Sequence, residues 1–337
     1  MQTMRAVVFE APGEIAVRER AIPQPLTDEV LIRVAACGIC GTDRHIMHGE
    51  FATRPPVVIG HEYAGTVVAV GPGVADLCEG DPVAVDPNIV CGQCRPCLRG
   101  QVHMCRNLAA LGVNQDGGFA EYAIAPRKQC HRLPAGVSLR DGAMVEPLAC
   151  CIHGMDLAGV RTGDRVAVIG GGAIGQLLAQ LARLSGAATV LVSDMVAARR
   201  KLARELGADL VWDPADGDPT QCGGPLAGGV DVVIEAVGSR ITNSQAIAWA
   251  APGGTVLWFG VTPPGHLVEV EPNLIFEKEL RIQGARINPF THGRAVDLLA
   301  ARRVNVAPLI TLEIGLEALP GELANPSPNQ TKIVVVP

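Results

Sequence analysis

The sequence of 337 residues lacks any apolar run long enough to cross a lipid bilayer. Its apolar stretches are interrupted by Gly, Asp or Arg well before the roughly 20 residues that a membrane-spanning helix needs. The first residues, Met1–Glu10, also lack the positive start, apolar stretch and small-residue cleavage site of a secretory signal. We therefore expect a soluble, cytoplasmic protein without a membrane partner.

A basic run, an internal repeat and a low-complexity tract are absent as well. The chain has 28 Lys and Arg against 34 Asp and Glu, a net charge of -6, so nucleic acid is not an expected partner. Hydrophobic residues make up 48% and charged residues 18%, which excludes a disordered chain and predicts a large core. The length of 337 residues favours two domains.

The pattern of apolar runs in the sequence changes near residue 150. Residues 5–125 contain short Val- and Ile-rich runs broken by Gly and Pro, which predicts an irregular β-rich domain. Residues 150–285 alternate apolar strands with helical stretches, which predicts a doubly wound α/β domain with a parallel sheet. The strands of that series are expected at 165–169, 189–193, 231–235 and 254–258.

The last part of the chain has no place in the parallel series. It contains an amphipathic stretch at 293–303 and a closing strand at 332–336, and we assign it to the first domain. The predicted boundaries are 1–148 for the first domain, 149–285 for the second, and 286–337 for the return. Residues 213–229, rich in Gly, Pro and Asp, are predicted to form a surface loop.

A glycine-rich turn follows the first strand of the α/β domain. Gly170, Gly172 and Gly175, with Ala173 and Ile174 before the last of them, match G-x-G-x-x-G between a strand and a helix. The first glycine permits the tight turn, the second lets the backbone approach a pyrophosphate, and the third lets helix and strand pack closely. The helix N-terminus would face the phosphates, so we predict a dinucleotide site.

The next strand is followed by Asp194, nineteen residues after Gly175. A carboxylate there can accept hydrogen bonds from both ribose hydroxyls and would repel a 2'-phosphate, so NAD is expected rather than NADP. Arg199 and Arg200 are the alternative signal, because they could pair with a 2'-phosphate. We favour the interpretation that both arginines are solvated charges on a helix surface. Arg199 is nevertheless included among the predicted cofactor-binding residues.

Four cysteines, Cys91, Cys94, Cys97 and Cys105, lie within fifteen residues of a loop at about 88–108. Four thiolates suit a closed tetrahedral zinc site that braces a loop and leaves no position for a substrate. An iron-sulfur cluster and ordinary free thiols are the rival interpretations. Six further cysteines match no metal pattern and are predicted to be small buried hydrophobes: Cys37, Cys78, Cys130, Cys150, Cys151 and Cys222.

A second, dispersed set consists of Cys40-Gly-Thr-Asp-Arg-His45, then His61-Glu62, then Glu146-Pro147. With the four-cysteine lobe and the glycine-rich turn, it resembles the zinc-containing medium-chain alcohol dehydrogenase family over nearly the whole chain. The resemblance is strongest to the polyol (sorbitol-type), butanediol and threonine dehydrogenase branch, where Glu-Pro replaces a cysteine ligand. It implies a GroES-like catalytic domain beside a Rossmann domain, and two zinc ions per chain.

The resemblance also implies roles for single residues. Cys40 and His61 would bind the catalytic zinc, and Glu62 or Glu146 would complete the shell directly or through water; the two carboxylates are not ranked. Such a set leaves one coordination position open for an alcohol, whose pKa zinc lowers. Thr42 would accept the proton and His45 would release it to solvent, while hydride passes to the nicotinamide. Asp43 would hold the far nitrogen of His61.

The implied reaction is oxidation of a secondary alcohol, a polyol or sugar alcohol, to a ketone. L-threonine 3-dehydrogenase and butanediol dehydrogenase are the alternatives. Arg286 does not decide between threonine and a polyol, because an arginine at this point could pair with the carboxylate of threonine, while the resemblance implies that it contacts substrate hydroxyls in polyol enzymes. A zinc-free quinone reductase or a non-catalytic relative is disfavoured because Cys40, Thr42, His45 and His61 are all present. The branch also implies a homotetramer. The chain departs from the family at 317–330, where two prolines near the end occupy a segment that is usually helical.

Overall fold

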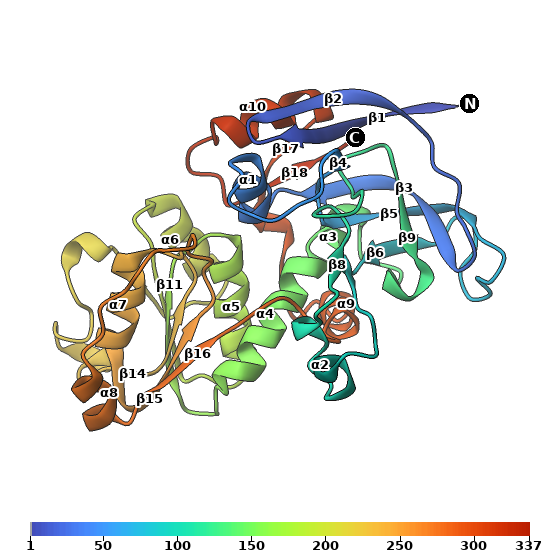
Figure 1. Cartoon of the computed structure of the whole chain (residues 1–337). Helices are drawn as coiled ribbons and strands as arrows, with labels where there is room; N and C mark the ends of the chain where they lie inside the picture. Colours follow the sequence, from blue (N-terminus) through green and yellow to red (C-terminus); the bar gives the residue numbers. More distant parts are fainter. Residues whose placement is uncertain (1) are drawn as a thin grey trace. The chain divides into compact units, whose positions relative to one another are not determined.

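The computed structural model describes residues 2–337, which divide into two compact units (Figure 1). Unit 1 comprises the chain up to Ala149 together with Asn288–Arg302 and Ile310–Pro337. Unit 2 comprises Cys150–Ile287 and Arg303–Leu309. The chain therefore leaves unit 1 once and comes back to it, so residues from both ends of the sequence can meet there.

Unit 1 is built on β-sheets. Its seven-stranded sheet has the order β10 (Cys130–Arg132), β6 (Pro82–Val85), β5 (Glu62–Val70), β3 (Glu29–Gly38), β18 (Lys332–Val335) and β17 (Ile310–Ile314), with β9 (Tyr122–Pro126) also paired to β3. Smaller sheets join β2 (Glu14–Ala21), β1 (Thr3–Ala11) and β4 (Val57–Val58), and separately β7 (Asn88–Ile89) and β8 (Ala109–Ala110). The helices are α1 (Gly41–Met47), α2 (Arg95–Leu98), α3 (Leu139–Gly142), α9 (His292–Ala300), α10 (Leu319–Ala324) and the start of α4 (Val145–Ala158).

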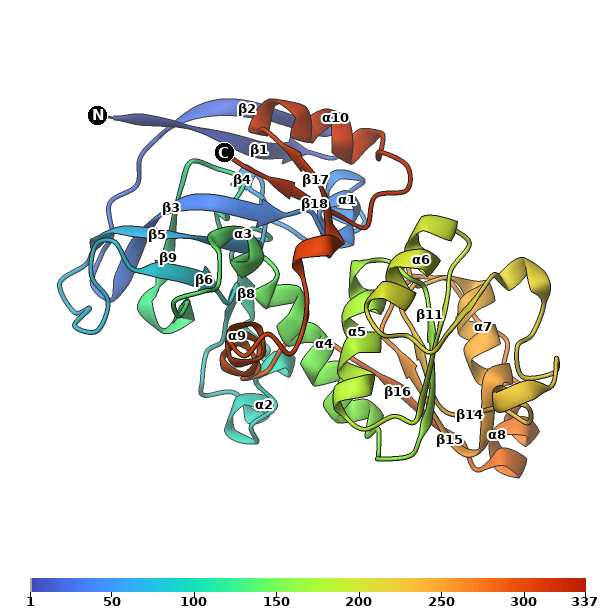
Figure 2. The same ribbon diagram turned by 180° about the vertical axis from the view of Figure 1, so that it is seen from behind.

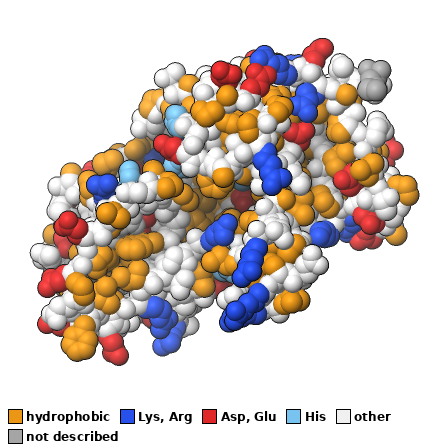
Figure 3. All heavy atoms as spheres, in the orientation of Figure 1, with side chains coloured by type: hydrophobic (Ala, Val, Ile, Leu, Met, Phe, Trp, Pro, Cys, Tyr) orange, Lys and Arg blue, Asp and Glu red, His pale blue; other side chains and the backbone are white. Residues whose placement is uncertain are grey.

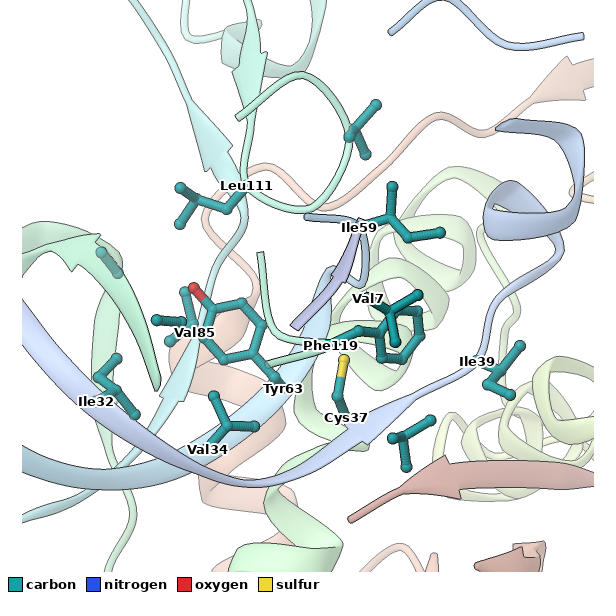
Figure 4. Packing of buried hydrophobic residues seen from close by; sticks show 14 of the residues in the cluster. Val7, Ile32, Val34, Cys37, Ile39, Ile59, Tyr63, Val85, Leu111 and Phe119 are labelled. Atoms are coloured by element: carbon teal, nitrogen blue, oxygen red, sulfur yellow. The ribbon is translucent and has the colours of Figure 1, made fainter. Parts of the chain in front are cut away.

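The core of unit 1 forms around β3. Val30, Ile32 and Val34 alternate along this strand and are all buried, because side chains two residues apart share one face of a strand. Tyr63 and Phe119 belong to the same apolar cluster and are almost completely buried (Figure 4). The strands that end near the sites described below are therefore anchored in a packed interior.

The C-terminal segment completes this sheet. The strand expected at 332–336 is present as β18, which pairs antiparallel with β3 and parallel with β17. The proline-containing segment before it does contain a short helix, α10, after a 3-10 turn at Leu316–Ala318. Pro320 lies in the first turn of α10, where a missing N–H removes no helical hydrogen bond.

Unit 2 contains the predicted parallel sheet. Its six strands have the order β13 (Leu210–Trp212), β12 (Thr189–Ser193), β11 (Arg165–Ile169), β14 (Val230–Glu235), β15 (Ala250–Trp258) and β16 (Arg281–Gly284), and every neighbouring pair is parallel. This is the doubly wound order of a dinucleotide-binding domain. The helices of unit 2 are the end of α4, α5 (Ala173–Leu184), α6 (Ala197–Glu205), α7 (Arg240–Trp249) and α8 (Pro272–Lys278). Figures 1 and 2 show α5 on one side of the sheet and α7 and α8 on the other.

The surface is of mixed polarity. On the face shown in Figure 3, acidic and basic side chains are interspersed with apolar ones. Within residues 2–337, no helix combines the length and the apolarity that crossing a membrane requires.

The prediction that the six remaining cysteines are buried is wrong for two of them. Cys37, Cys130 and Cys151 are buried and Cys150 is half-buried, whereas Cys78 and Cys222 are exposed. Figure 4 shows the Cys37 side chain within the core of unit 1. Cys78 lies in the turn before β6 and Cys222 in the loop at 213–229, so neither has a sheet face to pack against.

Candidate functional site

Cys40, His61 and Glu62 meet in unit 1, with their ligand atoms all within 4.8 Å of one another. Cys40 lies between the end of β3 and the start of α1, and Glu62 is the first residue of β5. The antiparallel register pairs Gly38 of β3 with Glu62, so the two strand ends bring the three side chains together. A thiolate, an imidazole and a carboxylate suit a zinc ion with one position left open.

Asp43 contacts both Cys40 and His61. Its side chain is fully buried; Oδ2 accepts a hydrogen bond from the backbone N–H of Cys40 at 2.8 Å, and Oδ1 lies 3.5 Å from Nδ1 of His61. Because Nδ1 faces Asp43, the other ring nitrogen of His61 is left for a metal. Burial lowers the pKa of His61, but the charges of Asp43 and Cys40 outweigh it and raise that pKa well above its ordinary value. The surroundings therefore favour a positive charge.

A buried ion pair joins Glu62 to Lys332, which sequence reasoning missed. Both side chains are almost completely buried, and the Lys332 ammonium donates to Oε2 of Glu62 and to the carbonyl of Ile39 at 2.8 Å. A Cβ on Gly38 would lie 2.2 Å from Oε2 of Glu62, so only glycine leaves room for the pair. Burial lowers the pKa of Lys332, while Glu62 and Cys40 raise it to above its ordinary value overall. A Lys at the start of a buried strand was the available signal.

Glu146 lies outside the ligand group formed by the described residues Cys40, His61 and Glu62. It is buried in the first turn of α4, and its Oε1 accepts a hydrogen bond from Asn288 at 2.9 Å. Asn288 in turn accepts one from Asn88 at 2.7 Å. Of the two carboxylates that the sequence leaves unranked, only Glu62 lies within ligand distance of both Cys40 and His61 here.

Thr42 and His45 occupy α1, three residues apart and hence on the same side of the helix. The Thr42 hydroxyl lies 3.7 Å from the sulfur of Cys40. Nδ1 of His45 lies 2.6 Å from a carboxylate oxygen of Glu50, and the His45 side chain is 24% exposed. Thr42 is thus next to a candidate ligand, whereas His45 reaches solvent.

The four cysteines of the lobe converge as the spacing predicts. Their sulfurs are separated by 3.4 Å (Cys94 to Cys97), 3.5 Å (Cys91 to Cys105) and 3.9 Å (Cys94 to Cys105). A tetrahedral zinc with bonds of about 2.3 Å would separate its sulfurs by about 3.8 Å. Backbone N–H groups lower the pKa of Cys91 to about 6, which favours the thiolate that zinc requires, whereas burial raises the pKa of Cys97 to about 12. The four residues fit a structural zinc.

The glycine-rich turn in unit 2 has the geometry of a phosphate-binding turn. Gly170 follows β11 with a φ of 101°, and α5 begins directly after Gly172. A Cβ on Gly175 would lie 1.7 Å from the carbonyl oxygen of Gly170, so a larger residue cannot pack there. A Cβ on Gly172 would contact nothing within 4 Å, so the protein's own packing does not require glycine at this position. The open space agrees with a ligand approaching the backbone.

Asp194 directly follows β12 and is held against this turn. Its Oδ2 accepts a hydrogen bond from the N–H of Gly171 at 2.7 Å, and its Oδ1 accepts one from Val196 at 2.7 Å. The guanidinium of Arg199 lies 3.7 Å from Oδ2 of Asp194. Arg200 instead donates to the Asp194 carbonyl and pairs with Asp213 at 2.9 Å. Only Arg199 of the two arginines therefore contacts the candidate ribose-binding carboxylate.

Comparison with known proteins agrees with both units. Residues 27–135 match the alcohol dehydrogenase GroES-like domain, and residues 173–300 match the zinc-binding dehydrogenase family. L-threonine 3-dehydrogenase of Thermococcus kodakarensis is 37% identical over 319 residues, covering 92% of this chain and 91% of the relative. Sorbitol dehydrogenase of Gallus gallus is 33% identical over 321 residues, covering 93% and 90%.

A solved structure is similar over its full length. It is a protein from Sinorhizobium meliloti 1021 assigned to the zinc-binding dehydrogenases and bound to NADP, with 47% identity, 100% coverage of both chains and a TM-score of 0.97. The predicted Rossmann and GroES-like domains are confirmed by these matches. The chain therefore belongs to the zinc-containing medium-chain alcohol dehydrogenase family.

Proposed function

We propose that this protein is a zinc-dependent dehydrogenase that oxidises a secondary alcohol, a polyol or sugar alcohol, to a ketone with NAD. The observation that carries the proposal is the buried group of Cys40, His61 and Glu62, whose ligand atoms lie within 4.8 Å of one another. Relatives named sorbitol dehydrogenase, D-arabinitol dehydrogenase and D-xylulose reductase support a polyol. Relatives named L-threonine 3-dehydrogenase make L-threonine the second candidate, and butanediol the third.

In this mechanism Cys40 and His61 would hold zinc, and Glu62 would complete the ligand set. A bound zinc ion supplies the Lewis acidity that lowers the pKa of an alcohol. Asp43 keeps His61 in a single ring orientation, as its contact with Nδ1 supports. The Thr42 hydroxyl would accept the alcohol proton beside Cys40 and give up its own proton, and His45, on the same side of α1, would release that proton to solvent.

We assign the carboxylate of the ligand set to Glu62 and not to Glu146. The hydrogen bond of Glu146 with Asn288 fixes a carboxylate that lies outside the ligand group of Cys40, His61 and Glu62. Lys332 pairs with Glu62, so the buried carboxylate is not left without a partner of opposite charge. The ligand set is thus one thiolate, one imidazole and one carboxylate that is shared with a lysine.

We further propose NAD as the cofactor, bound by the glycine-rich turn with Asp194 at the ribose. The Asp194 side chain is only 9% exposed, so a 2'-phosphate beside it would meet a poorly solvated negative charge. Arg199 is the group that could offset this repulsion. Because a similar protein is bound to NADP, the preference for NAD over NADP should be measured directly.

The proposal is tested by measuring NADH formation from polyols, 2,3-butanediol and L-threonine with the zinc-loaded protein. We expect activity with a polyol, with kcat/KM at least about tenfold above that for L-threonine, a difference of about 1.4 kcal/mol. The C40S variant should be inactive, because it lacks a zinc ligand. A zinc-loaded protein that reduces NAD with none of these alcohols would overturn the proposal, and a preference for L-threonine would replace the substrate.

A further inference from the structure

A third group of metal-binding side chains lies in unit 1, apart from the two zinc sites described above. Asp86, His131 and His292 each offer a ligand atom, and these atoms lie within 4.8 Å of one another. The three residues are widely separated in sequence and form no motif. Only folding brings them together.

Three ordered elements position the group. Asp86 follows β6, and its N–H donates to the carbonyl of Gln129 at 2.8 Å. His131 lies in β10, where it is paired with Ala84 of β6. His292 is the first residue of α9, which packs against β10. Because His131 lies in a strand, His292 in a helix, and Asp86 directly after a strand, their arrangement is preorganised.

The polar atoms of this group lie close to one another. Oδ1 of Asp86 accepts hydrogen bonds from the backbone N–H and the side chain of Asn88 at 2.9 and 3.2 Å. Its other oxygen, Oδ2, lies 3.4 Å from Nδ1 of His292. The His292 ring also stacks on that of His131, with centroids 5.2 Å apart and planes at 19°.

His292 is only 1% exposed, and neither of its ring nitrogens has a hydrogen-bond partner within residues 2–337. A buried polar group without a partner is destabilising, so such groups are normally satisfied by a ligand, water or ion. The two ring nitrogens of His292 are therefore available to a further partner.

The charges in this group suit a cation. Burial lowers the pKa of His131 to about 4 and that of His292 to about 3, so both rings are neutral at neutral pH and offer lone pairs. Burial also raises the pKa of Asp86 to about 6, which still leaves it mostly ionised at neutral pH. With neutral rings, the negative charge of Asp86 is not balanced by either histidine.

We propose that Asp86, His131 and His292 form a third metal site, which binds a divalent first-row transition ion, in the first instance Zn²⁺. Imidazole and carboxylate ligands suit Zn²⁺, and a tetrahedral ion with bonds of 2.0–2.1 Å separates its ligands by about 3.3 Å. The 3.4 Å between Oδ2 of Asp86 and Nδ1 of His292 matches that separation. The ion would link β6 and β10 to α9. It would therefore cross-link the part of unit 1 that precedes unit 2 in the sequence with the part that follows it.

The test is the zinc content of the full-length protein after metal removal, reloading with ZnCl₂ and exhaustive dialysis. The H131Q and D86N variants should each hold one zinc fewer than the unaltered protein. H131Q replaces a half-buried side chain, and D86N is isosteric, so at least one of them should fold. The matched control is H266Q, because His266 is exposed in a loop of unit 2 and should not alter the zinc content.

A second readout is thermal unfolding. Added ZnCl₂ should raise the Tm of the metal-stripped protein further than the Tm of either stripped variant, because an ion that binds only the native state stabilises it. Equal zinc content in the unaltered protein and in both folded variants overturns the proposal, as does loss of the additional zinc on dialysis. The C40S variant separates this result from the catalytic proposal, because it should lose a different zinc and retain the third site.

Discussion

At the scale of single residues, Lys332 supplies the positive charge that balances the buried carboxylate of Glu62. Both side chains are nearly inaccessible, and the partner of each is within bonding distance. Removing one member of a buried pair leaves the other charge uncompensated, at a cost of about 3–5 kcal/mol. A zinc ion beside Glu62 would supply positive charge of its own, so the cost should depend on the metal.

We therefore predict that K332M lowers the free energy of unfolding by about 3–5 kcal/mol in metal-free protein and by clearly less in zinc-loaded protein. Urea unfolding of both forms measures the difference. K201M is the matched control, because the Lys201 side chain is 80% exposed and should change neither form. Equal destabilisation of the two forms would show that the metal does not compensate the charge of Glu62 when Lys332 is absent.

The second prediction at this scale concerns Asp194 and the choice between NAD and NADP. The unaltered protein should prefer NAD over NADP by one to three orders of magnitude in kcat/KM, or about 1.4–4 kcal/mol. D194A should shrink the preference, mainly by weakening NAD, and should free Arg199, now 3.7 Å from the carboxylate, for a 2'-phosphate. Steady-state kinetics with both cofactors measures this. If the unaltered protein uses both equally, or if D194A keeps the full preference, Asp194 does not bind the ribose.

At the scale of elements, the cysteine lobe has little secondary structure of its own. Its helix α2 has four residues, and its two-stranded sheet has two residues per strand. Helices this short are not stable in isolation, so the fold of the lobe depends on cross-links. Zinc is the cross-link that four converging sulfurs support.

C97S should therefore lower the Tm and the zinc content, whereas C40S should abolish activity and leave the fold unchanged. Circular dichroism, zinc analysis and activity assays on the same preparations separate the two effects. The assignment of one site to structure and the other to catalysis fails if both variants lose folding to the same extent.

Elements with a strong local pattern could be predicted from the sequence. The strand of Arg165–Ile169, the turn at Gly170 and the helix after Gly172 are all present, because period, turn chemistry and helix start agree there. Cys40 and His61 could be found because their neighbours form recognisable motifs. Local patterns therefore identified the candidate ligands and the cofactor turn.

Contacts between distant residues could not be predicted in this way. Lys332 and Glu62 are 270 positions apart, and no local signal connects them. His131 and His292 match no motif, and only the packing of α9 on β10 brings them together. Cys78 and Cys222 were predicted to be buried because residue type alone does not reveal a loop position.

At the scale of the whole molecule, we predict a homotetramer. The strand β16 lies at the edge of the six-stranded sheet, where its outer hydrogen-bonding groups can pair with another copy. Unit 2 also exposes large apolar side chains, with Leu267 79% and Phe276 81% accessible. Light scattering at micromolar concentration should give the mass of four chains of 35.2 kDa, and a monomer would contradict the prediction.

Zinc removal should separate function from folding in the molecule as a whole. The proposed catalytic set has three protein ligands, one of them shared with Lys332, and would leave one coordination position of the zinc without a protein ligand, whereas the four sulfurs of the lobe would fill all the positions of theirs. A chelator should therefore remove the catalytic zinc first and leave a folded but inactive protein, before the loss of the lobe zinc lowers the Tm. Activity, zinc content and circular dichroism should be followed together during the titration. Simultaneous loss of activity and fold would mean that the two sites do not differ in accessibility.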